Sequence, residues 1–161
     1  MEGLRANFAY PELKIEGKNL YEASILFPLY GGNVSETTAL MQYAYQHYIT
    51  EESYPVIAET LLEIGITEMI HHEKLGEAIF ELGANPLIGD GRNFWNAGCV
   101  NYTTDMKGLI MSDITSEKQA IADYEKSILL ISNKSIRALI ERIIIDEELH
   151  LETLEKIYDS L

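Results

Sequence analysis

The chain carries the stretch IRALIERIIIDEELHLETL at residues 136–154. Its apolar residues recur three and four positions apart: Ile136, Leu139, Ile140, Ile143, Ile144, Leu151 and Leu154. This spacing places them on one face of a helix and outweighs the β-branched run 143–145, which alone would suggest a strand. The predicted helix extends from about Asn133 or Lys134 to Tyr158. Near its middle it carries Glu147 and His150, which lie on one face because they are three residues apart.

A second Glu-x-x-His occurs at Glu68-Met69-Ile70-His71. It lies within a helix predicted from about Ser53 or Tyr54 to Leu82, where Pro55 suits the first turn and Gly83 the position past the end. Each pair can offer a carboxylate and an imidazole to the same ion. One such pair is weak evidence in a chain rich in glutamate, but two pairs in two long helices are stronger.

Two further helices are predicted from about Asn19 to Ile49 and from about Thr104 to Ile131. Pro28 and Gly31-Gly32 should kink or split the first of these, since proline removes a helix hydrogen bond and glycine weakens a helix interior. The other is preceded by capping residues, Thr103 and Thr104, with Asp105 behind them.

Each of these two helices pairs a glutamate with a tyrosine. Glu36 precedes Tyr43 by seven residues, and Glu117 precedes Tyr124 by seven. At about 3.6 residues per turn, both members of each pair return to the same face. The two halves also keep similar spacing, with 32 residues from Glu36 to Glu68 and 30 from Glu117 to Glu147. The pattern indicates a duplicated helical hairpin.

The connections complete the predicted architecture. Short links join the first helix to the second and the third to the fourth, as in antiparallel hairpins. The segment 84–102 between the hairpins is rich in Gly and Asn and is long enough to cross a bundle. The sequence therefore predicts an all-α four-helix bundle with a long crossover between its second and third helices, forming a single domain over residues 1–161.

The four helices together predict one set of metal ligands: Glu36, Glu68, His71, Glu117, Glu147 and His150. One Glu from each of two helices and Glu-x-x-His from each of two others is the set used by di-iron and di-manganese bundles. Two divalent cations would balance the four carboxylates, as buried charges require. Oxygen and imidazole donors without thiolates suit iron or manganese. The predicted cofactor is two iron ions, with two manganese ions as the alternative.

Composition narrows the possible partners and location. The net charge of −14 argues against binding nucleic acid or an anionic membrane. No apolar run approaches the roughly 18 residues needed to cross a bilayer, and the N-terminus lacks the pattern of a secretory signal. Cys99 is the single cysteine, which excludes an internal disulfide. A reducing cytoplasm is therefore the expected location.

The motifs resemble those of the ferritin-like superfamily, with rubrerythrins, bacterioferritins and manganese catalases as the nearest groups. The resemblance spans roughly residues 20–158 and rests on these segments: Ser35-Glu36-Thr37-Thr38-Ala39 through Gln42-Tyr43, Glu68-Met69-Ile70-His71, Glu117-Lys118-Gln119-Ala120-Ile121 and Asp146-Glu147-Glu148-Leu149-His150. Tyr30-Gly31-Gly32 looks more like manganese catalases and their spore-coat relatives. By the family pattern Glu68 and Glu147 bridge the metals and are the catalytic carboxylates. Glu36 and Glu117 would be terminal ligands, and each histidine would bind one ion.

The resemblance implies a redox enzyme that reduces or disproportionates hydrogen peroxide or dioxygen. The single Cys99 leaves no Cys-x-x-Cys pairs for a rubredoxin-like domain, so an external electron donor is a possible partner. Iron binding, ferroxidase or storage activity without peroxide turnover is one alternative, and a metal-stabilised coat-type protein is another. Only 11 residues follow His150, too few for the short fifth helix of cage-forming ferritins. Outward tyrosines such as Tyr45 and Tyr48 favour a homodimer or small homo-oligomer.

Overall fold

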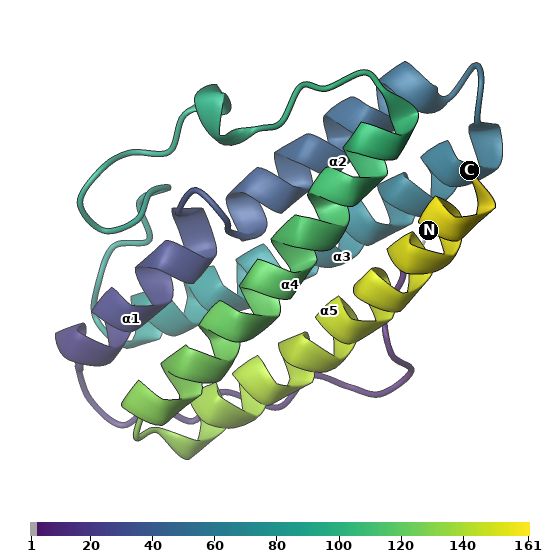
Figure 1. Ribbon diagram of the computed structural model, residues 1–161. Coiled ribbons are helices and arrows are strands. Elements are labelled where there is room, and N and C mark those ends of the chain that lie inside the picture. Colours follow the sequence, from purple (N-terminus) through teal and green to yellow (C-terminus); the bar gives the residue numbers. More distant parts are fainter. Residues whose placement is uncertain (1–2) are drawn as a thin grey trace.

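The computed structural model describes residues 3–161, which form helices joined by loops (Figure 1). In chain order they are α1 (Leu20–Gly31), α2 (Glu36–Thr50), α3 (Pro55–Glu81), a short 3₁₀ helix η1 (Ala97–Cys99), α4 (Met106–Leu130) and α5 (Lys134–Ser160). Within the described residues, extended pairing is confined to an isolated bridge between Gly89 and Phe94. The predicted all-α class is confirmed. No helix in residues 3–161 is long and apolar enough to cross a membrane.

The predicted first helix is split into α1 and α2. The backbone N–H of Gly32 donates to the carbonyl of Pro28 and closes α1. A new helix then starts, capped by Ser35, whose hydroxyl accepts from the backbone N–H of Thr38. The split sets Glu36 in the first turn of α2, where it is buried.

The other three helices begin and end within two residues of their predicted bounds. Gly83 follows α3 with φ +89°, a left-handed conformation that glycine adopts without strain. Asn133 caps α5 by accepting from two backbone N–H groups. The cap of α4 is Asp105, which accepts from the N–H of Gly108, and not Thr103 or Thr104 as the sequence suggested. Asp105 holds this role because it directly precedes the first helical residue.

Two hairpins, α2 with α3 and α4 with α5, form the bundle, and α1 packs against α3 and α4 (Figure 1). The crossover at residues 84–102 lies over α2 and connects the two hairpins, as predicted. Trp95 Nε1 donates to the hydroxyl of Thr38, and the N–H of Asn101 donates to Gln42 Oε1. These contacts position the long connection across the outside of the bundle.

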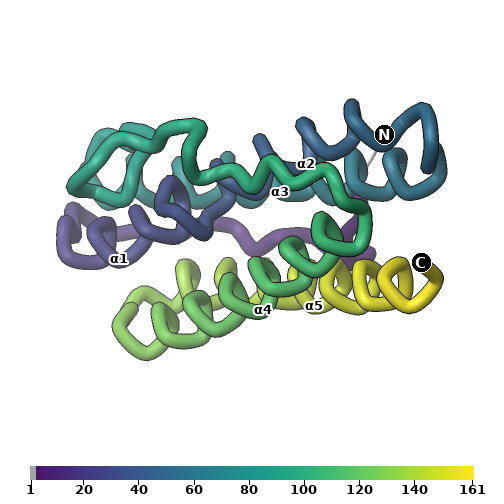
Figure 2. The backbone as a smooth tube through the Cα atoms, turned by 45° about the horizontal axis from the view of Figure 1, so that its top comes forward, coloured from purple at the N-terminus to yellow at the C-terminus, as the bar shows by residue number. Residues whose placement is uncertain are grey.

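The N-terminal segment lies along α3 and α5 and not on the crossover side (Figure 2). The N–H of Leu4 donates to the carbonyl of Glu63 in α3, at 3.0 Å. Arg142 of α5 donates to the carbonyls of Ala6 and Phe8. The chain start is thereby held to both hairpins.

The core is divided into two apolar clusters. One includes Leu26, Ile79 and Leu139, and the other includes Leu61 and Leu154. Between them lies a polar layer, formed by buried glutamates and histidines of the four bundle helices, α2, α3, α4 and α5. Burying such groups costs free energy unless they are compensated, so this polar layer is the place where the fold accommodates a charged ligand.

Candidate metal centre

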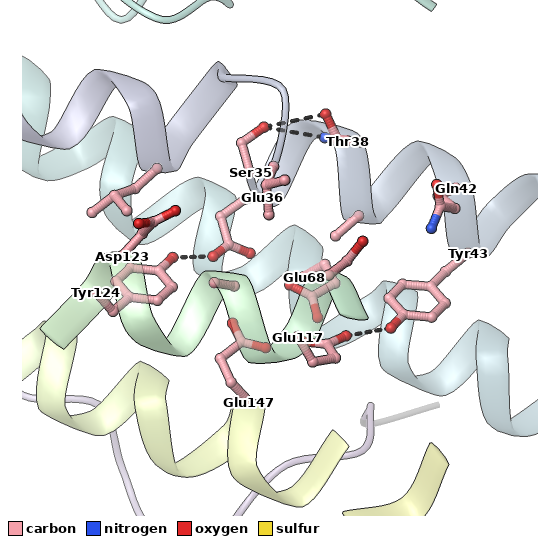
Figure 3. Close-up of a pocket in the computed structure, with 15 residues that line it drawn as sticks. Ser35, Glu36, Thr38, Gln42, Tyr43, Glu68, Glu117, Asp123, Tyr124 and Glu147 are labelled. Atoms are coloured by element: carbon pink, nitrogen blue, oxygen red, sulfur yellow. Dashed lines mark hydrogen bonds between the residues drawn. The ribbon is translucent and has the colours of Figure 1, made fainter. Parts of the chain in front are cut away.

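All six predicted ligands meet in the polar layer. The structure brings together Glu36 from α2, Glu68 and His71 from α3, Glu117 from α4, and Glu147 and His150 from α5. All are buried, and the most exposed of them, Glu117, shows 4% of its surface. Figure 3 shows the four carboxylates pointing toward one another from four helices.

The six residues form two overlapping groups. One contains Glu36, Glu68, His71 and Glu147, and the other contains Glu68, Glu117, Glu147 and His150. Within each group, one donor atom per residue lies within 4.8 Å of the others. Glu68 and Glu147 belong to both groups. This arrangement suits two ions that share a pair of carboxylates.

Both imidazoles turn Nδ1 toward the carboxylates. His71 Nδ1 lies 3.2 Å from Glu147 Oε1 and 3.5 Å from the nearest oxygens of Glu36 and Glu68. His150 Nδ1 lies 3.0 Å from Glu68 Oε1 and 3.1 Å from Glu147 Oε2. Nδ1 is therefore the nitrogen that each ring would offer to a metal.

The far nitrogens have different partners. His150 Nε2 lies 2.8 Å from the carbonyl oxygen of Leu4, which can only accept, so Nε2 carries the hydrogen and Nδ1 is left free for a metal. His71 Nε2 lies 3.1 Å from Asp146 Oδ2. Neither Leu4 nor Asp146 was predicted as part of the site. For Asp146 the signal was its position directly before Glu147.

Asp146 is held as an anion. It accepts from the hydroxyl of Tyr10 at 2.6 Å and from the N–H of Ala6 at 2.7 Å, and it pairs with Arg142 at 2.7 Å. Burial opposes its ionisation, but the hydrogen bonds from His71, Arg142 and Tyr10 keep its pKa well below the usual range. Asp146 can therefore accept the Nε2–H of His71.

Two buried tyrosines hold the outer glutamates, and they do so crosswise. The hydroxyl of Tyr124 in α4 donates to Glu36 of α2, and the hydroxyl of Tyr43 in α2 donates to Glu117 of α4 (Figure 3). Burial raises the pKa of both phenols, and the neighbouring glutamate charges raise it further, so they remain donors. The spacing within each helix did not reveal this exchange between helices.

The carboxylates differ in their protonation. Burial, reinforced by the charges of Glu68 and Glu147, raises the pKa of Glu36, and burial with the same two charges raises that of Glu117. For Glu68, burial acts against ionisation, but the adjacent Glu36 carboxyl and the His150 imidazole hold its pKa well below the usual range. The pKa of Glu147 is lowered as well, against burial and the charge of Glu68, by its histidine partners.

The histidines respond to these negative charges. Burial alone would lower the pKa of His71, but the charge of Glu147 and the bond to Asp146 raise it well above its ordinary value. The same opposition applies to His150, where the hydrogen bond with Glu147 and the ion pair with Glu68 prevail over burial. Both rings are therefore cations whenever protons alone fill the site.

The donor set fits two divalent cations of the iron or manganese type. Glu36 Oε2 and His71 Nδ1 are buried and lack an aligned hydrogen-bond partner among residues 3–161, although each has an opposite charge within 3.5 Å. Atoms that converge on a point without aligning with one another are arranged as metal ligands are. Oxygen and nitrogen donors are those that iron and manganese take.

A small cavity adjoins the carboxylates on the side between α2 and α4. It measures about 30 Å³ and is lined by Ala39, Tyr43, Ala120 and Tyr124 together with the four glutamates (Figure 3). Since a water needs at least about 10–15 Å³, the cavity has room for a small molecule beside the carboxylates.

Three other titratable residues of the bundle helices, Asp113, His47 and His72, lie outside both groups. Asp113 accepts from Gln42 Nε2 and Gln46 Nε2, each at 2.8 Å, and burial raises its pKa to about 7. His47 contacts the carbonyl of Ala58, and His72 stacks on the ring of Tyr30 at 4.2 Å. Both histidines thus lie apart from the six residues of the two groups.

Comparisons with known proteins agree with this fold. The family model described as rubrerythrin matches residues 32–158. A protein of Clostridium acetobutylicum named a probable manganese catalase is 27% identical over 161 residues, covering 86% of this chain and 71% of that protein.

Solved structures show the same bundle. The manganese catalase KatB of Anabaena PCC7120 superposes with a TM-score of 0.82 at 23% identity, covering 97% of this chain and 79% of that one. The bacterioferritin of Desulfovibrio desulfuricans, described with a diiron site, superposes with a TM-score of 0.76 at 27% identity, covering 87% and 79%. The predicted ferritin-like bundle is thereby confirmed.

Proposed function

The chain belongs to the rubrerythrin family, and on this premise we propose that it holds a dinuclear iron or manganese centre that reduces or disproportionates hydrogen peroxide. The observation that carries the proposal is the pair of four-residue groups that share Glu68 and Glu147. Glu36 and His71 would then complete one metal position, and Glu117 and His150 would complete the other. Two divalent cations would balance the four carboxylates and satisfy the unaligned donors.

When bound, the two ions supply electrons and a template for the oxygen–oxygen bond. The protein's own residues prepare that chemistry. Tyr124 and Tyr43 hold Glu36 and Glu117 from opposite helices. Glu68 and Glu147, whose pKa values are lowered, are ready as anions to hold both ions. The apolar clusters on either side keep bulk water out of the polar layer.

The size of the cavity supports a very small substrate. At about 30 Å³ beside the four glutamates, it has room for hydrogen peroxide or dioxygen. The protein named a probable manganese catalase, with 27% identity, supports peroxide as the substrate. The bacterioferritin with its diiron site, also 27% identical, supports iron equally, so the choice of metal is left to experiment.

Peroxide consumption by metal-loaded protein tests the proposal. We expect iron- or manganese-loaded protein to consume peroxide and Glu68→Ala to abolish this by removing a shared carboxylate. Glu73→Ala, an exposed glutamate on the same helix, is the matched control and should keep full activity.

The products distinguish the two reactions. Oxygen release without an added reductant identifies disproportionation. Peroxide loss only with a supplied electron donor identifies peroxidase activity and the need for an external partner. Peroxide left untouched by both the iron and the manganese forms would contradict the proposal and favour iron binding or a metal-stabilised scaffold.

A further inference from the structure

The two halves of the bundle differ at one equivalent position. Glu68 of α3 corresponds to Glu147 of α5, and the residue directly before each is Thr67 in one half and Asp146 in the other. Both are fully buried. The ligands are therefore duplicated between the two halves, but the residues that precede the two shared glutamates are not.

In one half, a carboxylate backs the histidine of the opposite hairpin. Asp146 of α5 reaches across to His71 of α3, with Oδ2 at 3.1 Å from Nε2. This contact leaves Nδ1 of the ring facing the glutamates. A carboxylate behind a ligating imidazole fixes its orientation and raises its basicity.

In the other half, a backbone carbonyl from the chain start takes this place. His150 Nε2 donates to the carbonyl oxygen of Leu4 at 2.8 Å, and the hydroxyl of Thr67 donates to the same oxygen at 3.0 Å. Thr67 therefore holds the Leu4 carbonyl behind His150, in the place that the carboxylate of Asp146 takes behind His71. A carbonyl is neutral and polarises the imidazole less than a carboxylate does.

The carbonyl is delivered by residues 3–10, which we call the N-terminal strap (Figure 2). The N–H of Leu4 is bonded to Glu63 of α3, and the guanidinium of Arg142 bonds the strap carbonyls and lies 4.4 Å from the ring centres of Phe8 and Tyr10. The strap thus connects the surroundings of both histidines.

We propose that the N-terminal strap positions His150 through the Leu4 carbonyl, and that it makes the two metal positions unequal. The position of His71, backed by Asp146, binds its ion more tightly than the position of His150, backed by Leu4. The proposal rests on the ligand assignment of the proposed function. Partners behind a metal ligand typically change metal affinity by about 10–100-fold, so the difference is measurable.

Stepwise titration of the metal-free full-length protein with Mn²⁺, following free Mn²⁺ by electron paramagnetic resonance, tests the inference. We expect two equivalents to bind with distinct affinities. Gly3→Ala should weaken only the second by about 10–100-fold. The new Cβ would lie 2.6 Å from Thr67 Oγ1 on backbone at φ +77°, so it displaces Leu4 from His150.

Gly17→Ala is the matched control. Gly17 has nearly the same backbone, φ +78°, but an added Cβ meets nothing within 4 Å. It should leave both affinities unchanged. Thr67→Val gives a second route, since it removes the hydroxyl that holds Leu4, and it is compared with Thr60→Val on the same helix, which loses only a bond to the Val56 carbonyl.

A rescue experiment separates positioning from general loosening. Thr67→Asp in the Gly3→Ala background places a carboxylate at the position equivalent to Asp146. It should restore the metal affinity that Gly3→Ala removes at the His150 position. Equal affinities in the unaltered protein, equal losses at both positions in Gly3→Ala, the same loss in Gly17→Ala, or failure of the rescue would each overturn the inference while the dinuclear site stands. Absence of Mn²⁺ binding by the unaltered protein would overturn the proposed function as well.

Discussion

At the scale of single residues, the centre balances its charge with protons when no metal is bound. The pKa values of Glu68 and Glu147 are lowered, those of His71 and His150 are raised, and the two outer glutamates are shifted toward the neutral acid. Two carboxylates and two imidazolium rings sum to zero. Metal binding is therefore an exchange of cations for protons.

This exchange predicts that metal affinity rises with pH. The raised pKa values of His71 and His150 mean that both rings are protonated at pH 7 and must release a proton to bind a metal. Affinity is therefore lost as the pH falls and gained as it rises toward the histidine pKa values. Calorimetric titration in buffers of different ionisation enthalpy should detect at least two protons released at pH 7, one from each ring. A binding enthalpy independent of the buffer would contradict this.

The crosswise tyrosines also support a residue-scale prediction. Tyr124→Phe and Tyr43→Phe each remove the donor of a buried glutamate, which should lower the free energy of unfolding by about 1–3 kcal/mol. Urea unfolding of the metal-loaded protein measures the change. Tyr48→Phe, where the side chain is 73% exposed, is the control and should differ by less than about 0.5 kcal/mol. Equal effects in all three variants would argue against the crosswise hydrogen bonds.

At the scale of elements, the end of α1 fits tightly against the crossover. A Cβ added at Gly31 would lie 2.5 Å from the backbone nitrogen of Gly89 and 2.7 Å from its carbonyl oxygen. Backbone atoms cannot rotate away as a side chain can. The helix and the crossover would have to separate, and with them the start of α2 that carries Glu36.

We therefore expect Gly31→Ala to destabilise the protein by about 1–3 kcal/mol, measured by chemical unfolding. Gly76→Ala is the matched control, because its Cβ would meet only the edge of the Tyr30 ring, at 3.3 Å, and alanine favours a helix interior. A loss at Gly76 as large as that at Gly31 would show that the crossover contact is not the cause.

At the scale of the whole molecule, the polar layer couples metal binding to stability. The ligands come from both hairpins, so two bound ions join α2 and α3 to α4 and α5. That the chain forms a single domain remains a prediction. If it does, two hairpins joined in this way should unfold together.

Removal of the metal should leave the helices formed but lower the melting temperature. At a free metal concentration of about 100 times Kd, each bound ion stabilises by roughly 2.7 kcal/mol, so two ions raise the melting temperature by about 10–20 °C for a chain of this length. Circular dichroism of metal-loaded and metal-free protein measures the shift. We expect one transition in each form. Two separate transitions would contradict the single-domain proposal, and equal melting temperatures would contradict the coupling.

A dimer or small oligomer remains a prediction. Tyr48 is exposed, as expected of an interface residue, whereas Tyr45 packs against Tyr102 of the crossover at 5.0 Å between ring centres. Sedimentation analysis should give a small assembly, and a hollow particle near half a megadalton would contradict it.

The sequence by itself determined the helices, the split at Pro28 and Gly31-Gly32, and which six residues meet. These features depend on local physics: apolar spacing, helix breakers, and ligands three residues apart on one face. A repeated local pattern in each half was enough to place the carboxylates on facing helices.

Only the tertiary structure decided what stands behind those ligands. The bond between His150 and Leu4 joins residues 146 positions apart, and a backbone carbonyl leaves no residue type in the sequence to mark it. The exchange of tyrosines between Glu36 and Glu117 likewise depends on how α2 and α4 face each other. Such contacts are set by the packing of whole elements, so periodicity within one element cannot specify them.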